Sequence, residues 1–175
     1  LNSGGSGDWS YITDAIVYAA DNGAHIINLS LGGTSASQAV REAAIYARQR
    51  GSLVIAAAGN TDTCSPPAYA VLYPAAFPEV VAVAATTADD SPWYYSCRGP
   101  EVDVAAPGVN IYSCRYQSAL YWTMSGTSMA APHVAGLAAL LWAYQPSATA
   151  DEILQIITST AKDVHTPGKD IYTGW

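Results

Sequence analysis

The hydrophobic positions of this chain fall into short continuous runs, separated by longer stretches in which apolar residues recur with helical spacing. Residues 25–29, 53–58 and 80–85 are such runs, and their length and lack of polar alternation are typical of strands buried on both faces. Residues 102–106 are a candidate fourth strand. Strands of this kind occur in parallel sheets covered by helices, so the pattern predicts an α/β fold.

A helix is predicted between the first two apolar runs. Ser35 or Ser37 is expected to cap it, and it runs to about Arg50 with four apolar residues facing inward: Val40, Ala44, Ile45 and Ala47. A strand, a helix and a strand in close succession form a βαβ unit, in which the two strands are parallel and the crossover is right-handed. Residues 32–33 and 59–60 therefore emerge at the same carboxyl edge of the sheet, where open α/β folds bind ligands.

The remaining segments follow the same reasoning. Residues 2–10 are rich in glycine and serine and are expected to form a loop, followed by a helix that ends at Asn22 and Gly23. Residues 111–114 and 120–124 alternate well enough to predict a hairpin. A more polar helix is predicted from Thr149 to about Thr160.

Ser128 lies where the second strand of that hairpin turns into a long apolar helix that reaches Tyr144. A serine there is placed at the positive end of the helix dipole, beside backbone N–H groups that lack intrahelical partners. It could act as an N-cap, or as a nucleophile whose oxyanion those N–H groups hold. Pro132 fixes the helix start close to Ser128, because proline is tolerated only near the first turn.

That helix has almost no polar face. Its large apolar residues lie on all sides: Met129, Val134, Leu137, Leu140, Leu141 and Trp142. The pattern predicts a buried helix, and Gly136 within it predicts close packing against another backbone. An exposed serine at the start of a buried helix favours the nucleophile over the cap.

Composition limits the classes of function. The chain has 175 residues, 50% of them hydrophobic and 12% charged, which is enough for one well-buried core in a single domain. The net charge of −7 argues against a nucleic-acid partner. No apolar run is long enough to span a membrane, and no signal-peptide pattern precedes the first elements. Leu1 is interpreted as a position inside a larger domain.

Residues 126–136, Gly-Thr-Ser-Met-Ala-Ala-Pro-His-Val-Ala-Gly, resemble the nucleophile motif of the subtilisin-like serine proteases. Residues 30–33 are similar to that family's segment that pairs with the substrate backbone, and residues 56–60 to its segment with the oxyanion asparagine. Residues 73–75 and 102–108 also look like family landmarks. The resemblance implies a three-layer α/β fold with a mostly parallel sheet, incomplete because the N-terminal part is missing. Residues 1–175 would then be part of one catalytic domain, truncated at both ends.

The resemblance also implies roles for individual residues. Ser128 would be the nucleophile of a serine endopeptidase and Asn60 an oxyanion donor, although an Asx turn is the other interpretation of Asn60. The residues expected to bind the peptide or protein substrate are Ser30, Leu31, Gly32, Ala57, Ala58, Gly59, Leu72 and Thr127. Leu72 would form the floor of the P1 pocket and disfavour the largest side chains. The Tyr73–Pro74 bond is expected to be cis, since only X–Pro bonds adopt that form cheaply.

The general base is not evident in the sequence. His133 lies about 140° round an ideal helix from Ser128 and about 7.5 Å along it, so it cannot face the serine hydroxyl and is expected to be a hydrogen-bonded core residue. His25 is expected to be structural, and His165 solvated in a terminal loop. In subtilisin-like proteases the aspartate and histidine precede the serine. Both are therefore expected upstream of Leu1, in an N-terminal part that would act as a partner, and the 175 residues alone are expected to be inactive.

Two other functions remain open. An α/β-hydrolase-type esterase would use Ser128, Asp163 and His165 in that order, but Ala130 stands where the nucleophile elbow needs glycine. The chain could also be a non-catalytic peptide-binding module that keeps the groove. Neither Ser128 nor Asn60 would be needed for recognition by strand pairing alone.

Three cysteines, Cys64, Cys97 and Cys114, allow one disulfide with a free thiol, or a bond to a segment outside the chain. They match no metal-ligand spacing. The family resemblance implies an extracellular location and no catalytic cofactor. It further implies a structural calcium ion, held by the backbone carbonyls of Ala75, Phe77 and Val80.

Overall fold

The computed structural model describes residues 6–62, 64, 69–115 and 120–175. Its elements are, in chain order, α1 (Trp9–Asp21), β1 (Ile26–Leu29), α2 (Gln38–Gln49), β2 (Leu53–Ala57), β3 (Val81–Thr86), β4 (Val102–Pro107), β5 (Ile111–Cys114), β6 (Tyr121–Met124), α3 (Thr127–Tyr144) and α4 (Ala150–Thr160). Every predicted helix and strand is present, with ends shifted by a few residues. No helix within the described ranges is both long enough and apolar enough to cross a membrane.

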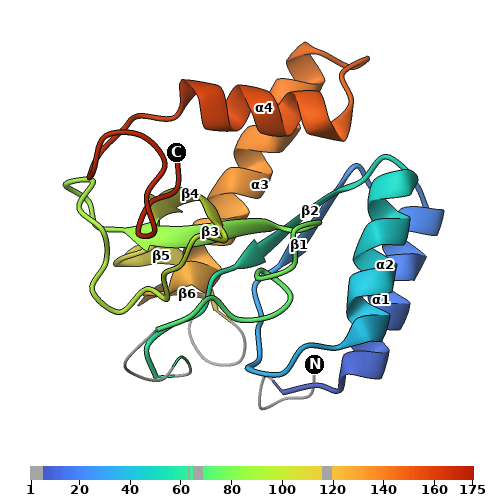
Figure 1. Cartoon of the computed structure of the whole chain (residues 1–175), viewed down its shortest axis with the longest axis horizontal. Coiled ribbons are helices and arrows are strands. Elements are labelled where there is room, and N and C mark those ends of the chain that lie inside the picture. The colour runs from blue at the N-terminus through green and yellow to red at the C-terminus, as the bar shows by residue number, and fades with distance from the viewer. Residues whose placement is uncertain (1–5, 63, 65–68, 116–119) are drawn as a thin grey trace.

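The main sheet has the strand order β1-β2-β3-β4, and each neighbouring pair is parallel (Figure 1). The parallel pairing predicted for the first two strands is confirmed, with Ile27 opposite Val54. β5 and β6 form a separate antiparallel hairpin in which Ile111 is opposite Met124. The hairpin leads directly into α3, so it positions the start of that helix.

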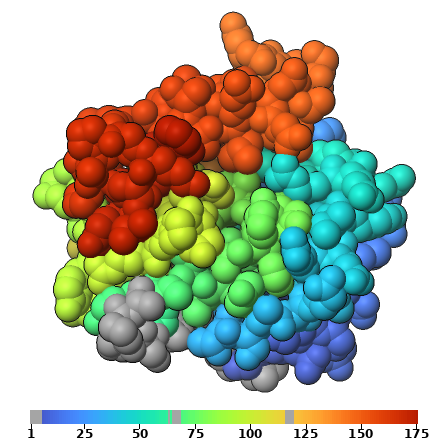
Figure 2. Space-filling view, viewed as in Figure 1, coloured from blue at the N-terminus to red at the C-terminus, as the bar shows by residue number. Residues whose placement is uncertain are grey.

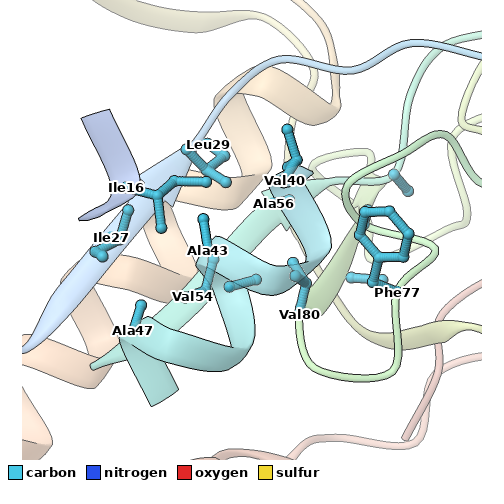
Figure 3. Packing of buried hydrophobic residues seen from close by; sticks show 14 of the residues in the cluster. Ile16, Ile27, Leu29, Val40, Ala43, Ala47, Val54, Ala56, Phe77 and Val80 are labelled. Carbon is cyan, nitrogen blue, oxygen red and sulfur yellow. The ribbon is translucent and has the colours of Figure 1, made fainter. Parts of the chain in front are cut away.

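Helices cover both faces of the sheet. α1 and α2 pack on one face, while α3 and α4 pack on the other (Figure 1). Because successive side chains of a strand point to opposite faces, Val54 and Ala56 of β2 join the first core and Leu53 and Ile55 join the second. The first core also contains Phe77 and Val80 from the loop before β3 (Figure 3). The predicted three-layer α/β architecture is confirmed.

Side-chain caps define where three of the helices begin. Ser37, and not Ser35, caps α2 by accepting a hydrogen bond from Val40 N–H. Thr149 and Glu152 form a reciprocal capping box at α4. The expected loop over residues 2–10 is wrong at its end, since α1 begins at Trp9 with Asp8 accepting from Ser10 N–H.

The prediction that α3 is buried all round is wrong for the described residues. Ala130, Val134 and Ala138 face the sheet, but Leu140 is 72% exposed and Tyr144 is 83% exposed. Leu137, Pro132 and His133 share this exposed face. A side chain at Gly136 would meet nothing within 4 Å, so the close backbone packing predicted there is absent from the described part of the chain. α3 therefore carries an apolar face that no described element covers.

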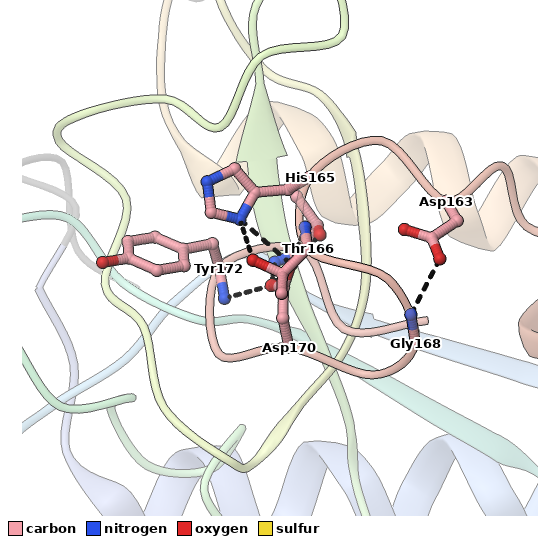
Figure 4. A network of polar contacts seen from close by, with 7 residues as sticks. Asp163, His165, Thr166, Gly168, Asp170 and Tyr172 are labelled. Atoms are coloured by element: carbon pink, nitrogen blue, oxygen red, sulfur yellow. Dashed lines mark hydrogen bonds and ion pairs between the residues drawn. The ribbon is translucent and has the colours of Figure 1, made fainter.

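The C-terminal segment is organised by one carboxylate. Asp170 accepts hydrogen bonds from the backbone N–H groups of Thr166, Tyr172 and Thr173 and lies 3.1 Å from Nδ1 of His165 (Figure 4). Burial raises the pKa of Asp170, but these hydrogen bonds outweigh it and hold that pKa at about 2.

The same segment ends against the outer edge of β4. Gly174 pairs with Val104, and Trp175 N–H donates to the Asp103 carbonyl at 3.0 Å. In the space-filling view the red C-terminal residues lie directly on the yellow-green part of the chain (Figure 2). A Cβ at Gly174 would meet the Asp103 backbone at 2.3 Å, so only glycine allows this close approach.

Candidate active site

Ser128 is the second residue of α3 and is not its cap. The N-cap position is Gly126, and no side chain caps the helix. The Ser128 side chain is half-buried, and its hydroxyl lies 3.4 Å from the carbonyl oxygen of Ser30. Ser30 in turn donates its hydroxyl to the Ser128 carbonyl at 2.8 Å. These contacts join the helix start to the carboxyl end of β1, where the βαβ argument placed a ligand site.

Asn60 follows β2 and reaches the same helix start. Its side-chain oxygen accepts a hydrogen bond from Thr127 N–H at 3.0 Å and another from the Thr127 hydroxyl at 3.2 Å. The Asn60 amide nitrogen and oxygen lie 3.4 and 3.6 Å from where a Cβ on Gly126 would stand, so the whole amide group is beside the helix start. The structure thus brings Asn60 and Ser128 together at the positive end of one helix dipole.

Thr127 was predicted to bind the substrate, but the structure places it in the interior. Its side chain is fully buried, so it is not available to contact a substrate. Its hydroxyl accepts from Gly59 N–H at 3.1 Å and donates to Asn60. Thr127 therefore ties the end of β2 to the start of α3, a positioning role that sequence reasoning missed.

The other predicted substrate-binding residues surround this point. Ser30 and Leu31 are half-buried and Gly32 is exposed, so this segment offers backbone to the outside. Ala57, Ala58 and Gly59 are buried at the end of β2. Leu72 is 5% exposed, and Tyr73 pairs with Gly33 through two backbone hydrogen bonds. The Tyr73–Pro74 bond is cis, as predicted.

A pocket of about 380 Å³ opens beside Ser128. It is lined by the hairpin and by the first turns of α3, including Trp122, Met124, Ser128, Met129 and His133. His133 is at the surface, so its prediction as a core residue is wrong; it lies on the uncovered face of α3, with Nδ1 2.8 Å from the Met129 carbonyl oxygen. His133 is hydrogen-bonded, as expected.

The other two histidines are placed elsewhere. His25 is exposed at the start of β1, where it packs edge-on against Trp142 with ring centroids 5.5 Å apart. His165 pairs with Asp170, while Asp163 accepts from Gly168 N–H in the same loop (Figure 4). The structure forms no Asp163–His165 pair, and neither residue lines the pocket that holds Ser128. The esterase alternative loses its support.

A lysine from the C-terminal segment lines the same pocket as the loop predicted to bind calcium. Phe77 and Val80 line a pocket with Glu101, Asp103 and Lys169, and the Lys169 ammonium lies 3.5 Å from Asp103 Oδ1. The Phe77 carbonyl already accepts from Val80 N–H. No cluster of three or more His, Cys, Asp or Glu side chains suited to a metal occurs among the described residues. Calcium binding at Ala75, Phe77 and Val80 therefore stays a prediction.

The cysteine question is resolved within the chain. Cys64 and Cys97 form a disulfide across 33 residues, and Cys114 on β5 is an exposed free thiol. The sequence alone left the pairing open.

Comparison with known proteins places this geometry in a family. The profile of the Subtilase family matches residues 1–175. The chain is 44% identical to thermitase of Thermoactinomyces vulgaris over 168 residues, which cover 96% of this chain and 57% of thermitase. It is 41% identical to subtilisin DY of Bacillus licheniformis over 174 residues, which cover 99% of this chain and 62% of that protein.

The solved structure of sphericase superposes with a TM-score of 0.90 at 33% identity, covering 99% of this chain and 64% of sphericase. The chain thus spans about three-fifths of the length of each of these proteins. A matching profile over the whole chain, substantial identity and the same fold lead to one conclusion. The chain belongs to the subtilase family.

Proposed function

We propose that the full-length protein containing these residues is a serine endopeptidase that cleaves peptide bonds through an acyl-enzyme on Ser128. The observation that carries the proposal is the convergence of Asn60 and Ser128 on the start of α3, fixed by the hydrogen bonds of Thr127. Backbone N–H groups at a helix start and a side-chain amide nitrogen are the donors that an oxyanion needs.

The chemistry follows from these positions. Ser128 Oγ attacks the carbonyl carbon of the scissile peptide bond, and its proton passes to a general base. The negative charge that develops on the carbonyl oxygen is held by the Ser128 N–H and the Asn60 amide. Collapse of the tetrahedral intermediate transfers the proton to the leaving amine and leaves an acyl ester on Ser128. Attack by water then releases the acid and restores the hydroxyl.

The general base and its orienting carboxylate are proposed to come from a segment of the domain outside residues 1–175. Three observations support this assignment. None of the three histidines stands at hydrogen-bonding distance from the Ser128 hydroxyl in the described structure. The relatives are longer than this chain. A pocket beside Ser128 and the uncovered apolar face of α3 leave room for a packed segment that carries a histidine.

The substrate is proposed to lie as an extended peptide along residues 30–32, paired through its backbone. The P1 side chain would enter between that segment and residues 57–59. No catalytic cofactor is needed in this scheme. An extracellular location is also proposed, and the Cys64–Cys97 disulfide supports it, because disulfides persist in oxidising compartments.

The test compares three forms of the full-length protein on a chromogenic peptide. Ser128→Ala should abolish turnover. Asn60→Ala should lower kcat by about 10²–10³-fold with little change in KM, a magnitude taken from the corresponding oxyanion donor of subtilisin. Peptide binding by the unaltered protein without Ser128-dependent hydrolysis would refute the enzyme and favour a non-catalytic peptide-binding module.

A further inference from the structure

The Cys64–Cys97 disulfide encloses the dipeptide that carries the candidate oxyanion donor. Cys97 N–H donates to the Gly59 carbonyl at 2.8 Å, and Cys64 N–H donates to the Asn60 carbonyl at 2.9 Å. Both half-cystines are buried, with Cys97 fully inaccessible. The disulfide therefore joins two backbone segments, each of which donates a hydrogen bond to the turn after β2.

Leu72 fills the space between the two segments proposed to hold the P1 side chain. A Cβ on Gly59 would stand 2.6 Å from two side-chain atoms of Leu72 and 3.0 Å from the Cys97 sulfur. On the other side, a Cβ on Gly32 would stand 3.1 Å from Leu72 Cβ. Gly59 also has a φ of +106°, a conformation that other residues rarely adopt. The leucine thus touches both walls.

Among the described residues, the buried cluster that contains Leu72 is small, and its other two buried members are the half-cystines. Cys64, Leu72 and Cys97 form a buried cluster of their own, apart from the two large cores, with Tyr69 packed against it. Two bonded sulfur atoms occupy less volume than the two separate thiols that reduction of the disulfide would leave in this cluster. Losing the bond therefore loosens the surroundings of Leu72 more than it would in a large core.

We propose that the Cys64–Cys97 disulfide determines P1 specificity by holding Leu72 against Gly32 and Gly59, so that small P1 side chains are preferred. This inference rests on the proposed protease function. The cysteines act as positioning residues through Leu72 and do not touch the substrate.

The experiment measures kcat/KM of the full-length protein on two peptides that differ only at P1, alanine or phenylalanine. The variants are Leu72→Ala, the double variant Cys64→Ser with Cys97→Ser, and the triple combination. Cys114→Ser is the matched control for removal of a cysteine outside the cluster. Titration of Ser128 with an organophosphorus inhibitor gives the concentration of competent sites in each preparation.

The unaltered protein and Cys114→Ser should prefer alanine. Leu72→Ala and the double cysteine variant should each raise the phenylalanine-to-alanine ratio of kcat/KM by roughly tenfold or more, mainly through KM, since even one methylene of space in a hydrophobic pocket is worth about that much. The triple variant should differ little from Leu72→Ala, because residues that act through one another are not additive.

A double variant that folds and keeps the parental ratio overturns the inference while leaving the protease intact. So does a triple variant in which the two effects simply add.

If the double variant yields no competent sites, the folded wild-type protein is treated with a dithiol, which delivers two electrons and two protons, leaves thiols at Cys64 and Cys97 and departs as a cyclic disulfide. After this reduction, the phenylalanine-to-alanine ratio of kcat/KM must rise both in the wild-type protein and in Cys114→Ser. Absence of any Ser128-dependent turnover would instead refute the proposed function itself.

Discussion

Thr127 shows how much the geometry of a site can depend on one buried residue. Its hydroxyl accepts from Gly59 and donates to Asn60, and its backbone N–H also donates to Asn60. The neighbouring Ser128 is thereby fixed relative to both. The motif around Ser128 predicted the nucleophile, but a buried hydroxyl with partners 67 and 68 positions away in sequence leaves no local signal.

Met129 is the residue whose oxidation should affect the site most. It follows Ser128, lines the pocket beside it, and places its sulfur 3.7 Å from where a Cβ on Gly126 would stand. A sulfoxide there would put a polar oxygen beside the acyl centre. We expect mild peroxide to slow the full-length enzyme severalfold and Met129→Ala to resist it.

The other methionine provides the control for that measurement. Met124 is 50% exposed and lines the same pocket from the hairpin. Met124→Ala should remain as sensitive to peroxide as the unaltered enzyme when initial rates are followed. Equal sensitivity of Met129→Ala would contradict the assignment.

At the scale of elements, the uncovered face of α3 can be tested through Leu140. In the isolated 175-residue chain this side chain is 72% exposed, so Leu140→Ala should change the free energy of unfolding by only a few tenths of a kcal/mol. In the full-length protein, where we propose that the face is covered, the same change should cost about 2 kcal/mol or more. Denaturant unfolding of both forms gives the two values. Val134 faces the sheet and is buried, so Val134→Ala should lower the free energy of unfolding in both the isolated chain and the full-length protein.

The elements were more predictable than their surroundings. Apolar runs such as residues 53–58 predicted the parallel strands, because burial on both faces leaves a direct mark on composition. The apolar pattern of α3 correctly predicted a helix but not its exposed face, and we propose that a segment outside residues 1–175 covers that face. The pairing of Cys64 with Cys97 and the Asp170 network depend on loop geometry, which periodicity does not encode.

The Asp170 network should make stability depend on pH. Because the folded pKa is about 2, below the ordinary value of 3.8, ionised Asp170 stabilises the fold above about pH 4, and this contribution is lost as the pH falls toward 2. The shift corresponds to about 2 kcal/mol. Asp170→Asn should lose that amount at pH 6, and the difference from the unaltered protein should shrink toward pH 2 in urea unfolding.

Asp163→Asn is the matched control for that pH series. It removes a carboxylate from the same loop that accepts one backbone N–H, from Gly168. A stability difference for Asp170→Asn that stays constant from pH 6 to pH 2 would contradict the assignment.

At the scale of the whole molecule, the 175 residues alone should not hydrolyse peptides at a protease's rate. Without a base the Ser128 hydroxyl stays protonated near neutral pH, and loss of the serine or histidine of subtilisin costs about 2 × 10⁶ in kcat. Purified chain should gain activity only when mixed with the segment that we propose lies upstream and carries the base. Turnover by the chain alone, abolished by Ser128→Ala, would reveal a base among these residues.

The C-terminal segment that pairs with β4 makes the two edges of the main sheet different. One edge is closed by the pairing of Gly174 with Val104, while no described strand pairs with the outer edge of β1. A further strand added at β1 would lie next to the strand that leads to Ser30. A strand that completes the sheet at β1 would therefore lie beside the segment that contacts Ser128. At the far edge, the C-terminal residues occupy part of the position that another strand would need.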